Sequence, residues 1–364
     1  MGFRCGIIGL PNVGKSTIFN ALTAAGAEVA NYPFCTIDPN VGIVKVPDAR
    51  LEKIATIVKP PKLTYTTMEF LDIAGLVKGA SRGEGLGNKF LGHIREVEAV
   101  VHVVRCFENP DVVHVTGAVD PVRDVEIVNT ELVLADLETL DKRLVRDEKL
   151  LRTGDKTLVK TVEFLKRIRE SLDRGTMARQ LAADEETRKL IEDLHLISAK
   201  KVLYVANVDE KGLKGGSIHL AARENYAAKE GSRVIVICGD LEAEIAQLPE
   251  PEKKEFMDDL GLEESGLEKL IRAGYELLGY ITFYTTVGPE LRAWTIVKGT
   301  KAPEAAGRIH SDMERGFIRA EVLHFDVFLK LGGLSAAKEK GLIRSEGKEY
   351  IIHDGDIVLF RFNV

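Results

Sequence analysis

The stretch Gly9-Leu10-Pro11-Asn12-Val13-Gly14-Lys15-Ser16-Thr17 decides the fold of this chain. It fits G-x-x-x-x-G-K-[S/T], the pattern of a phosphate-binding loop. The mostly apolar run Phe3–Ile8 before it predicts a buried strand, and the run Ser16–Thr23 after it has the apolar spacing of one helix face. A glycine turn that only joins a strand to a helix would rarely carry the full pattern. We therefore expect a loop that holds a nucleoside triphosphate.

The residue types in this loop match the chemistry of a phosphate chain. Gly9 and Gly14 carry no side chain, so the backbone can turn sharply and approach phosphate oxygens. The amides that follow, at the start of a helix, face the anion. Lys15 can reach the β- and γ-phosphates, and the Ser16 hydroxyl can bind Mg²⁺.

Two further segments are expected to contact the γ-phosphate and the metal. The loop Asn31–Thr36 is rich in turn formers, and Thr36 is the natural second hydroxyl ligand for Mg²⁺. A strand over Thr66–Leu71 ends at Asp72-Ile73-Ala74-Gly75, which matches D-x-x-G. Asp72 is expected to support the Mg²⁺ shell. Together these segments predict a switch that hydrolysis releases.

The position after D-x-x-G carries Leu76, where small GTPases have a glutamine that orients the attacking water. An aliphatic side chain cannot orient water, so another residue or a partner must do so, or hydrolysis is slow. His114 is a candidate because it follows the strand Ala99–Arg105 at the edge where such folds bind ligands. Its position alone favours an ordinary surface histidine.

The base-recognition motif departs from that of GTPases. Asn207-Val208-Asp209-Glu210 follows the strand Lys201–Ala206, where GTPases carry N-K-x-D. Val208 replaces the lysine, and Glu210 replaces the aspartate that accepts hydrogen bonds from guanine. Asn207 can still contact the base, and backbone groups near Val208 could read adenine. This site favours ATP over GTP.

Nearly a hundred residues separate the strands Ala99–Arg105 and Lys201–Ala206, far more than a crossover needs. Apolar residues recur there in two runs at helical spacing, separated by Thr153-Gly154-Asp155. The pattern predicts an antiparallel, coiled-coil-like helical hairpin. Its charges are dense and mixed in sign, which suits either a solvated helix pair or an arm that contacts a partner.

The pattern changes again at Ile281, where short strand-like runs and one helical piece predict a compact α+β module. We therefore expect an α/β protein in which an inserted arm divides a nucleotide-binding domain with a mainly parallel sheet. The expected boundaries are 1–125 and 199–280 for the nucleotide-binding domain, 126–198 for the arm and 281–364 for the C-terminal module.

Composition limits the class of protein. The chain has 364 residues, 45% hydrophobic and 29% charged, with a formal charge of −6, which gives no global argument for nucleic-acid or membrane binding. Its four cysteines lack metal-site spacing and suggest free thiols in a reducing compartment. No signal-peptide pattern or membrane-length apolar run occurs. We expect a cytoplasmic enzyme or switch.

Four stretches together resemble the YchF/Obg-like ATPase family, an ATP-preferring branch of the Obg-related P-loop GTPases. They are the phosphate loop, NYPFCTIDPN at Asn31–Asn40, DIAGLVKGAS at Asp72–Ser81, and Asn207–Glu210. The likeness runs along essentially the whole chain. The C-terminal module resembles a β-grasp-like TGS domain.

The resemblance assigns roles to residues of this chain. It implies that Asn12, Val13, Gly14, Lys15, Ser16 and Thr17 hold the phosphates, that Ser16 and Thr36 bind Mg²⁺, and that Val208 contacts adenine through its backbone. His114 matches a family histidine proposed to help hydrolysis. Asn12 also resembles that of K⁺-stimulated relatives, so K⁺ is a hypothesis as a second cofactor.

The resemblance also implies a function: a slow, Mg²⁺-dependent ATPase, monomeric, that switches on ribosomes through subunit and rRNA contacts and affects translation or stress responses. Lys15 and His114 are the candidate catalytic residues. One alternative is a GTPase of the same fold. Another is an ATP-gated binding protein in which hydrolysis is incidental.

Overall fold

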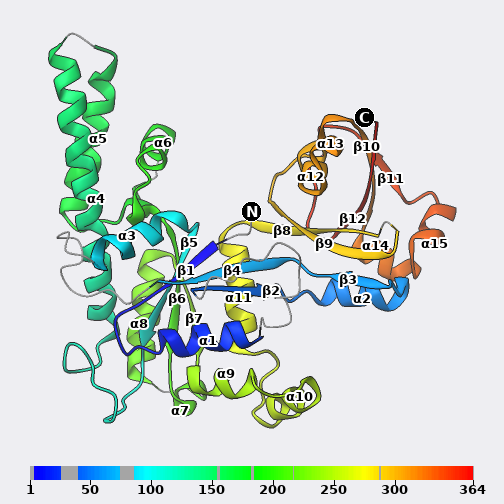
Figure 1. Ribbon diagram of the computed structural model, residues 1–364, viewed down its shortest axis with the longest axis horizontal. Coiled ribbons are helices and arrows are strands. Elements are labelled where there is room, and N and C mark those ends of the chain that lie inside the picture. The colour runs from blue at the N-terminus through cyan, green and yellow to red at the C-terminus, as the bar shows by residue number, and fades with distance from the viewer. Residues whose placement is uncertain are drawn as a thin grey trace. The chain divides into compact units, whose positions relative to one another are not determined.

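A computed structural model describes residues 4–25, 40–73, 86–153, 156–181, 184–215, 217–286 and 288–363. The chain forms two compact units (Figure 1). The first holds Met1–Val44 and Glu69–Leu270, and the second holds Lys45–Met68 and Ile271–Val364. Each unit is built on its own six-stranded sheet.

The sheet of the first unit has the strand order β2-β4-β1-β5-β6-β7. The ladders from β4 through β1, β5 and β6 to β7 are all parallel. Every residue of β5 is buried, as expected of a parallel strand covered on both faces. The predicted α/β class is confirmed. The strands are β1 (Arg4–Ile8), β2 (Val41–Lys45), β4 (Thr67–Asp72), β5 (Ala99–Arg105), β6 (Lys201–Asn207) and β7 (Arg233–Ile237).

Helices follow the strands of this sheet, as βαβ connections require. The predicted helix after the phosphate loop is α1. Outside the arm, the helices are α1 (Lys15–Ala25), α3 (Leu86–Glu96), α7 (Glu210–Leu213), α8 (Ile218–Glu230), α9 (Gly239–Ile245), α10 (Glu250–Asp259) and α11 (Gly266–Leu277).

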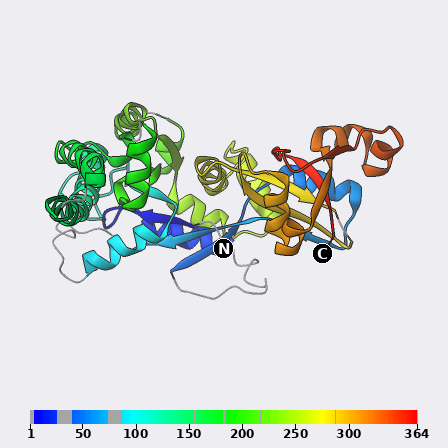
Figure 2. The same ribbon diagram turned by 90° about the horizontal axis from the view of Figure 1, so that it is seen from above.

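The inserted arm is a pair of antiparallel helices, α4 (Pro121–Arg152) and α5 (Val159–Asp173). Figure 2 shows the two helices end-on as neighbouring coils. Leu140 and Leu144 of α4 and Leu165 and Leu172 of α5 are buried, so most of the apolar stripe read from the sequence forms their contact. The arm is followed by α6 (Glu185–Asp193), which the sequence did not reveal as a separate helix.

One buried carboxylate anchors the base of the arm. Asp136 of α4 is 1% exposed and accepts hydrogen bonds from the backbone N–H groups of Ile197 and Ser198, both at 2.8 Å. These two residues lie just before β6. The arm is therefore tied to the sheet at the point where the chain returns to it.

The second unit has a mixed sheet of order β11-β10-β12-β8-β9-β3, with β12 and β8 parallel at its centre. This is the expected β-grasp-like module. Its strands are β3 (Lys62–Thr64), β8 (Tyr280–Thr285), β9 (Glu290–Val297), β10 (Phe317–His324), β11 (Arg344–Glu346) and β12 (Asp356–Phe362). Its helices are α2 (Ala49–Val58), α12 (Ala302–Ile309), α13 (Ser311–Arg315), α14 (Phe325–Leu331) and α15 (Leu334–Glu339).

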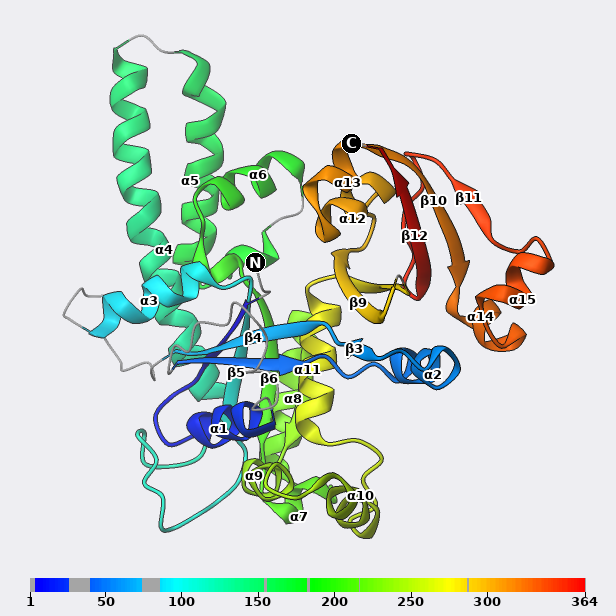
Figure 3. The ribbon, with the colours of Figure 1, turned by 45° about the vertical axis from the view of Figure 1, so that its right-hand side comes forward.

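The second unit does not match the expected module 281–364, because it also contains residues 45–68. The side chains of Leu51 and Ile54 of α2 are fully buried in a cluster with Tyr284 and Phe328. The strand β3 pairs in parallel with β9, and Figure 3 shows α2 next to β3. Because β3 has only three residues, its sequence contains no pattern from which its partner strand could be predicted.

Two expectations from composition can be compared with the described residues. Cys5, Cys106 and Cys238 are buried free thiols, whereas Cys35 lies outside the described part of the chain. Among the helices that the structure describes, none combines the length and apolar character needed to cross a bilayer.

Candidate functional site

The phosphate loop, residues 9–14, joins the buried strand β1 to α1. Asn12 has φ 63° and Gly14 has φ 89°, both in the left-handed region that lets the loop curl back to the helix start. A Cβ atom at Gly9 would lie 2.6 Å from the Val103 carbonyl oxygen. The backbone therefore requires glycine here for packing as well as for phosphate approach.

Lys15 and Asp72 meet at the carboxyl edge of the sheet. Lys15 is 9% exposed and its Nζ forms an ion pair with the Asp72 carboxylate. Asp72 lies opposite Ile7 in the β1–β4 ladder, so strand pairing brings the two motifs together. The structure thus places these two residues side by side.

Two of the described residues carry side-chain oxygen atoms of the kind that Mg²⁺ prefers as ligands. The Ser16 side chain is exposed at the start of α1, and the Asp72 carboxylate lies nearby through its bond with Lys15. Among the described residues, no cluster of three or more His, Cys, Asp or Glu could hold a metal by itself. Thr36, Gly75 and Leu76 lie outside the described residues.

Asn207 connects three loops of this edge. It is 4% exposed, and its Nδ2 donates to the Val13 carbonyl at 2.9 Å. Its Oδ1 accepts from the Gly239 N–H at 3.0 Å, and its backbone carbonyl accepts from the Cys106 N–H at 2.8 Å. A Cβ at Gly14 would lie 2.0 Å from Asn207 Nδ2. In this arrangement the side chain positions the phosphate loop, a role that the motif alone did not reveal.

Val208 and Asp209, the next two residues of the base motif, have structural roles in this fold. Val208 is 2% exposed in an apolar cluster, and its N–H donates to the Ile237 carbonyl at 2.8 Å. Asp209 caps α7, since its Oδ1 accepts from the Gly212 N–H at 2.8 Å. Glu210 is exposed in the first turn of α7.

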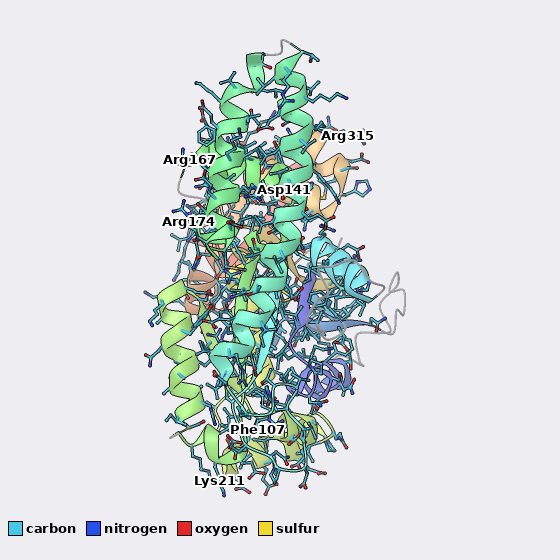
Figure 4. The ribbon with its side chains drawn as sticks, turned by 90° about the vertical axis from the view of Figure 1, so that its left-hand side faces the viewer. Phe107, Asp141, Arg167, Arg174, Lys211 and Arg315 are labelled. Carbon is cyan, nitrogen blue, oxygen red and sulfur yellow. The ribbon has the colours of Figure 1, made fainter. Side chains whose placement is uncertain are left out.

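Buried side chains hold the loop 106–120, which follows β5, in place. Arg105, 1% exposed, donates to the carbonyl groups of Phe107, Asn109 and Val112 at 2.9–3.1 Å. Its guanidinium also lies over the Phe107 ring, at the end of the unit opposite the arm tip (Figure 4). Asn12 Nδ2 donates to the Val113 carbonyl at 3.1 Å. The loop is therefore held directly against the phosphate loop.

His114 occupies the inner side of this loop instead of its surface. Its Nε2 lies 2.9 Å from Asp124 Oδ2, and its Nδ1 lies 2.8 Å from Thr116 Oγ1. Burial raises the pKa of the Asp124 carboxyl, and the neighbouring imidazole opposes that rise. Both ring nitrogens have partners, so the structure excludes the surface-histidine alternative. Sequence reasoning missed Asp124 because nothing marks a carboxylate in a helix's first turn as facing inward.

Comparisons with known proteins agree with this geometry. The YchF-GTPase_C family model, described as a protein of unknown function, matches residues 280–363, and the model described as 50S ribosome-binding GTPase matches residues 4–143. The chain is 54% identical to the ribosome-binding ATPase YchF of Bacillus subtilis, with both chains covered in full.

The chain belongs to the YchF family. It is also 52% identical to the protein of the same name from Haemophilus influenzae, again over the full length of both. The solved structure of the Schizosaccharomyces pombe YchF GTPase matches with a TM-score of 0.90 at 35% identity, covering 99% of this chain and 98% of that one. The resemblance read from the four motifs is confirmed.

Proposed function

We propose that the chain is a Mg²⁺-dependent ATPase of the YchF type that hydrolyses ATP slowly and acts as a nucleotide-dependent switch on ribosomes. The observation that carries the proposal is the base motif, in which Asp209 caps a helix and Val208 is buried. Val208 cannot act as the GTPase lysine that it replaces, and Asp209, one position before the place of the GTPase aspartate, serves as a helix cap. The curated relatives at 54% and 52% identity are named ribosome-binding ATPases.

The preference for adenine follows from the groups left at this site. The Val208 N–H is already bonded to Ile237, so a base contact from Val208 would come from its carbonyl oxygen. A carbonyl accepts a hydrogen bond from the 6-amino group of adenine but faces an acceptor in guanine. The mismatch of two acceptors costs far more than one lost contact.

Hydrolysis would use charge stabilisation more than proton transfer. Lys15 would leave Asp72 to bind the β- and γ-phosphates, and the amides at the start of α1 would bind the phosphate oxygens. Ser16, Thr36 and Asp72 would hold Mg²⁺, which would stabilise the negative charge of the transferring phosphoryl group. A slow rate follows from Leu76 in the water-orienting position and from the buried state of His114.

The arm is the element that we assign to ribosomal RNA. Residues 142–169 hold ten Lys and Arg against four Asp and Glu, although the whole chain has a formal charge of −6. Several of these cations are paired within the arm, for example Arg169 with Asp141. Lys149, Arg152 and Lys160 are exposed near the tip. Figure 4 shows Arg167 and Arg174 along α5, and Asp141 on α4.

Charge reversal would test this assignment. The triple variant Lys149→Glu, Arg152→Glu, Lys160→Glu should weaken ribosome co-sedimentation and reduce its salt dependence, with a log–log slope smaller by about two to three. The matched control reverses Lys229, Lys254 and Lys269, which are exposed elsewhere in the first unit. Equal loss in both variants would argue against the arm as the binding element.

Equilibrium affinities for ATP and GTP, with Mg²⁺ and K⁺ present, test the proposed function first. An ATP preference of at least about tenfold, or ~1.4 kcal/mol, supports it. Equal or reversed preference favours the GTPase. If ribosome binding needs only bound ATP and survives when turnover is blocked, the protein is an ATP-gated binder instead. Equal hydrolysis rates in K⁺ and Na⁺ buffers would remove K⁺ as a cofactor.

The remaining parts of the proposal concern the cell. We propose that the protein works in the cytoplasm, where it would bind ribosomes, and that it modulates translation or the stress response. We also propose that the chain acts as a monomer, which sedimentation at working concentration can check.

A further inference from the structure

His114 and Asp124 form a buried pair close to the phosphate loop. Their side chains are 3% and 2% exposed, and 2.9 Å separates His114 Nε2 from Asp124 Oδ2. The pair closes a chain of hydrogen bonds in which Arg123 donates to Thr116 Oγ1 and the Thr116 hydroxyl faces His114 Nδ1. The Thr116 N–H also points at Nδ1, at 3.3 Å. Nδ1 is therefore an acceptor, and Nε2 carries the proton that Asp124 accepts.

In the described part of the chain, the only side-chain hydrogen bond of Asp124 is the one to this histidine. Its second oxygen, Oδ1, has no hydrogen-bond partner there and lies 4.0 Å from Arg123 Nε. A buried carboxylate that loses its one side-chain hydrogen bond is disfavoured. The pair should therefore stay closed unless the two elements that carry it move apart.

Those two elements are the loop 106–120 and the helix α4. Asp124 lies in the first turn of α4, and the same helix continues without a break to Arg152 in the arm. Its 32 residues span about 48 Å as one rod. A displacement of the arm therefore reaches Asp124 through a single rigid element.

The other side of the pair is already next to the nucleotide site. The Val113 carbonyl accepts a hydrogen bond from Asn12 of the phosphate loop, so the residue adjacent to His114 touches that loop. Val113 is 77% exposed and Val115 is 50% exposed, while His114 between them points inward. Once released from Asp124, the imidazole needs to turn outward but does not need to travel far.

We propose that Asp124 is a latch that keeps His114 away from the bound nucleotide, and that displacement of α4 by a partner on the arm releases it. Asp124 is thus a positioning residue that acts through His114. The inference rests on the proposed function, and on the expectation from the sequence that His114 assists ATP hydrolysis. It gives the arm a second role, since the same helix that binds RNA would control turnover.

The variant Asp124→Asn tests the latch because it replaces a charge-assisted hydrogen bond by a neutral one at almost equal volume. Without ribosomes, ATP hydrolysis by this variant should rise by about tenfold. Weakening one such hydrogen bond should shift the equilibrium between bonded and released His114 by about this factor. The control is Asp120→Asn, which changes the N-cap carboxylate of the same helix and leaves His114 untouched. Its rate should match the unaltered protein.

Chemical modification of His114 gives a readout that is independent of turnover. Diethylpyrocarbonate, followed by mass spectrometry of the peptide, should modify His114 faster in Asp124→Asn, and also in Thr116→Val, than in Asp120→Asn. Faster modification without faster hydrolysis would overturn the proposal, as would slower hydrolysis with His114 still protected.

Two comparisons separate this inference from the proposed function. The double variant His114→Ala, Asp124→Asn should lose the acceleration, and persistence of the acceleration would overturn the latch. Ribosomes should accelerate the unaltered protein more than Asp124→Asn, whereas equal stimulation would remove the link to the arm. Absence of ATP hydrolysis in the unaltered protein, or no effect of His114→Ala, would instead refute the proposed function or the role of His114.

Discussion

Two loops lie side by side at the carboxyl edge of the first sheet, and they are built in opposite ways. The phosphate loop 9–14 is shaped by its backbone, with glycine where a Cβ would collide. The loop 106–120 is shaped by side chains of the strand before it and the helix after it, mainly Arg105 and Asp124. A loop of the first kind can be recognised from its sequence motif. The second can be recognised only once the fold has brought its supports together.

The largest expected effect concerns the one charge that the phosphate loop supplies. Lys15→Ala should lower ATP affinity at least about 100-fold, or ~3 kcal/mol, because a partly buried ammonium–phosphate contact is lost. Titration calorimetry with ATP and Mg²⁺ measures this. Lys142→Ala on the arm is the control and should bind normally. Unchanged affinity in Lys15→Ala would contradict the assignment of the loop.

The backbone conformation of the same loop should be disturbed by adding one methyl group at Gly14. Gly14→Ala places a Cβ 2.0 Å from Asn207 Nδ2 at a residue with φ 89°. We expect about 2–3 kcal/mol of lost stability and a weaker nucleotide contact. Urea unfolding of the apo protein measures the first effect.

The matched control is Gly92→Ala, in the helix α3, where an added Cβ meets no atom within 4 Å. This substitution should stabilise the protein by about 0.5–1 kcal/mol, because alanine favours a helix. If Gly14→Ala were as harmless, the loop would not depend on glycine.

The same contrast explains how much the sequence could predict. The phosphate loop, its strand and its helix follow from local pattern, and strand order then places Asp72 beside Lys15. The place of α2 and β3 could not be predicted, since it depends on pairing with β9 more than two hundred residues away. The burial of His114 depends likewise on the inward face of a helix that begins several residues later.

The side-chain loop can be loosened without touching the phosphate loop. Arg105→Met should remove three hydrogen bonds to backbone carbonyls and cost about 2 kcal/mol. Hydrogen exchange of the amides in 107–113 should accelerate, while ATP affinity changes by less than about threefold, or ~0.7 kcal/mol. A parallel loss of affinity would show that the two loops form one unit energetically.

The smallest expected effect is a pH dependence of stability that arises from His102. Like Arg105, this residue is a buried basic residue of β5. Carbonyl groups solvate Arg105, whereas burial, aided by Arg223 and Arg179, lowers the pKa of His102 to about 3. The unfolded chain therefore binds a proton below about pH 6.5 that the folded protein refuses, so stability falls as the pH falls. Between pH 7.5 and pH 5 this histidine should cost about 2 kcal/mol. His102→Phe cannot take up the proton, so its unfolding free energy should decline less over that range by this amount. Parallel declines in urea titrations of the two proteins would mean that His102 accepts its proton inside the folded sheet.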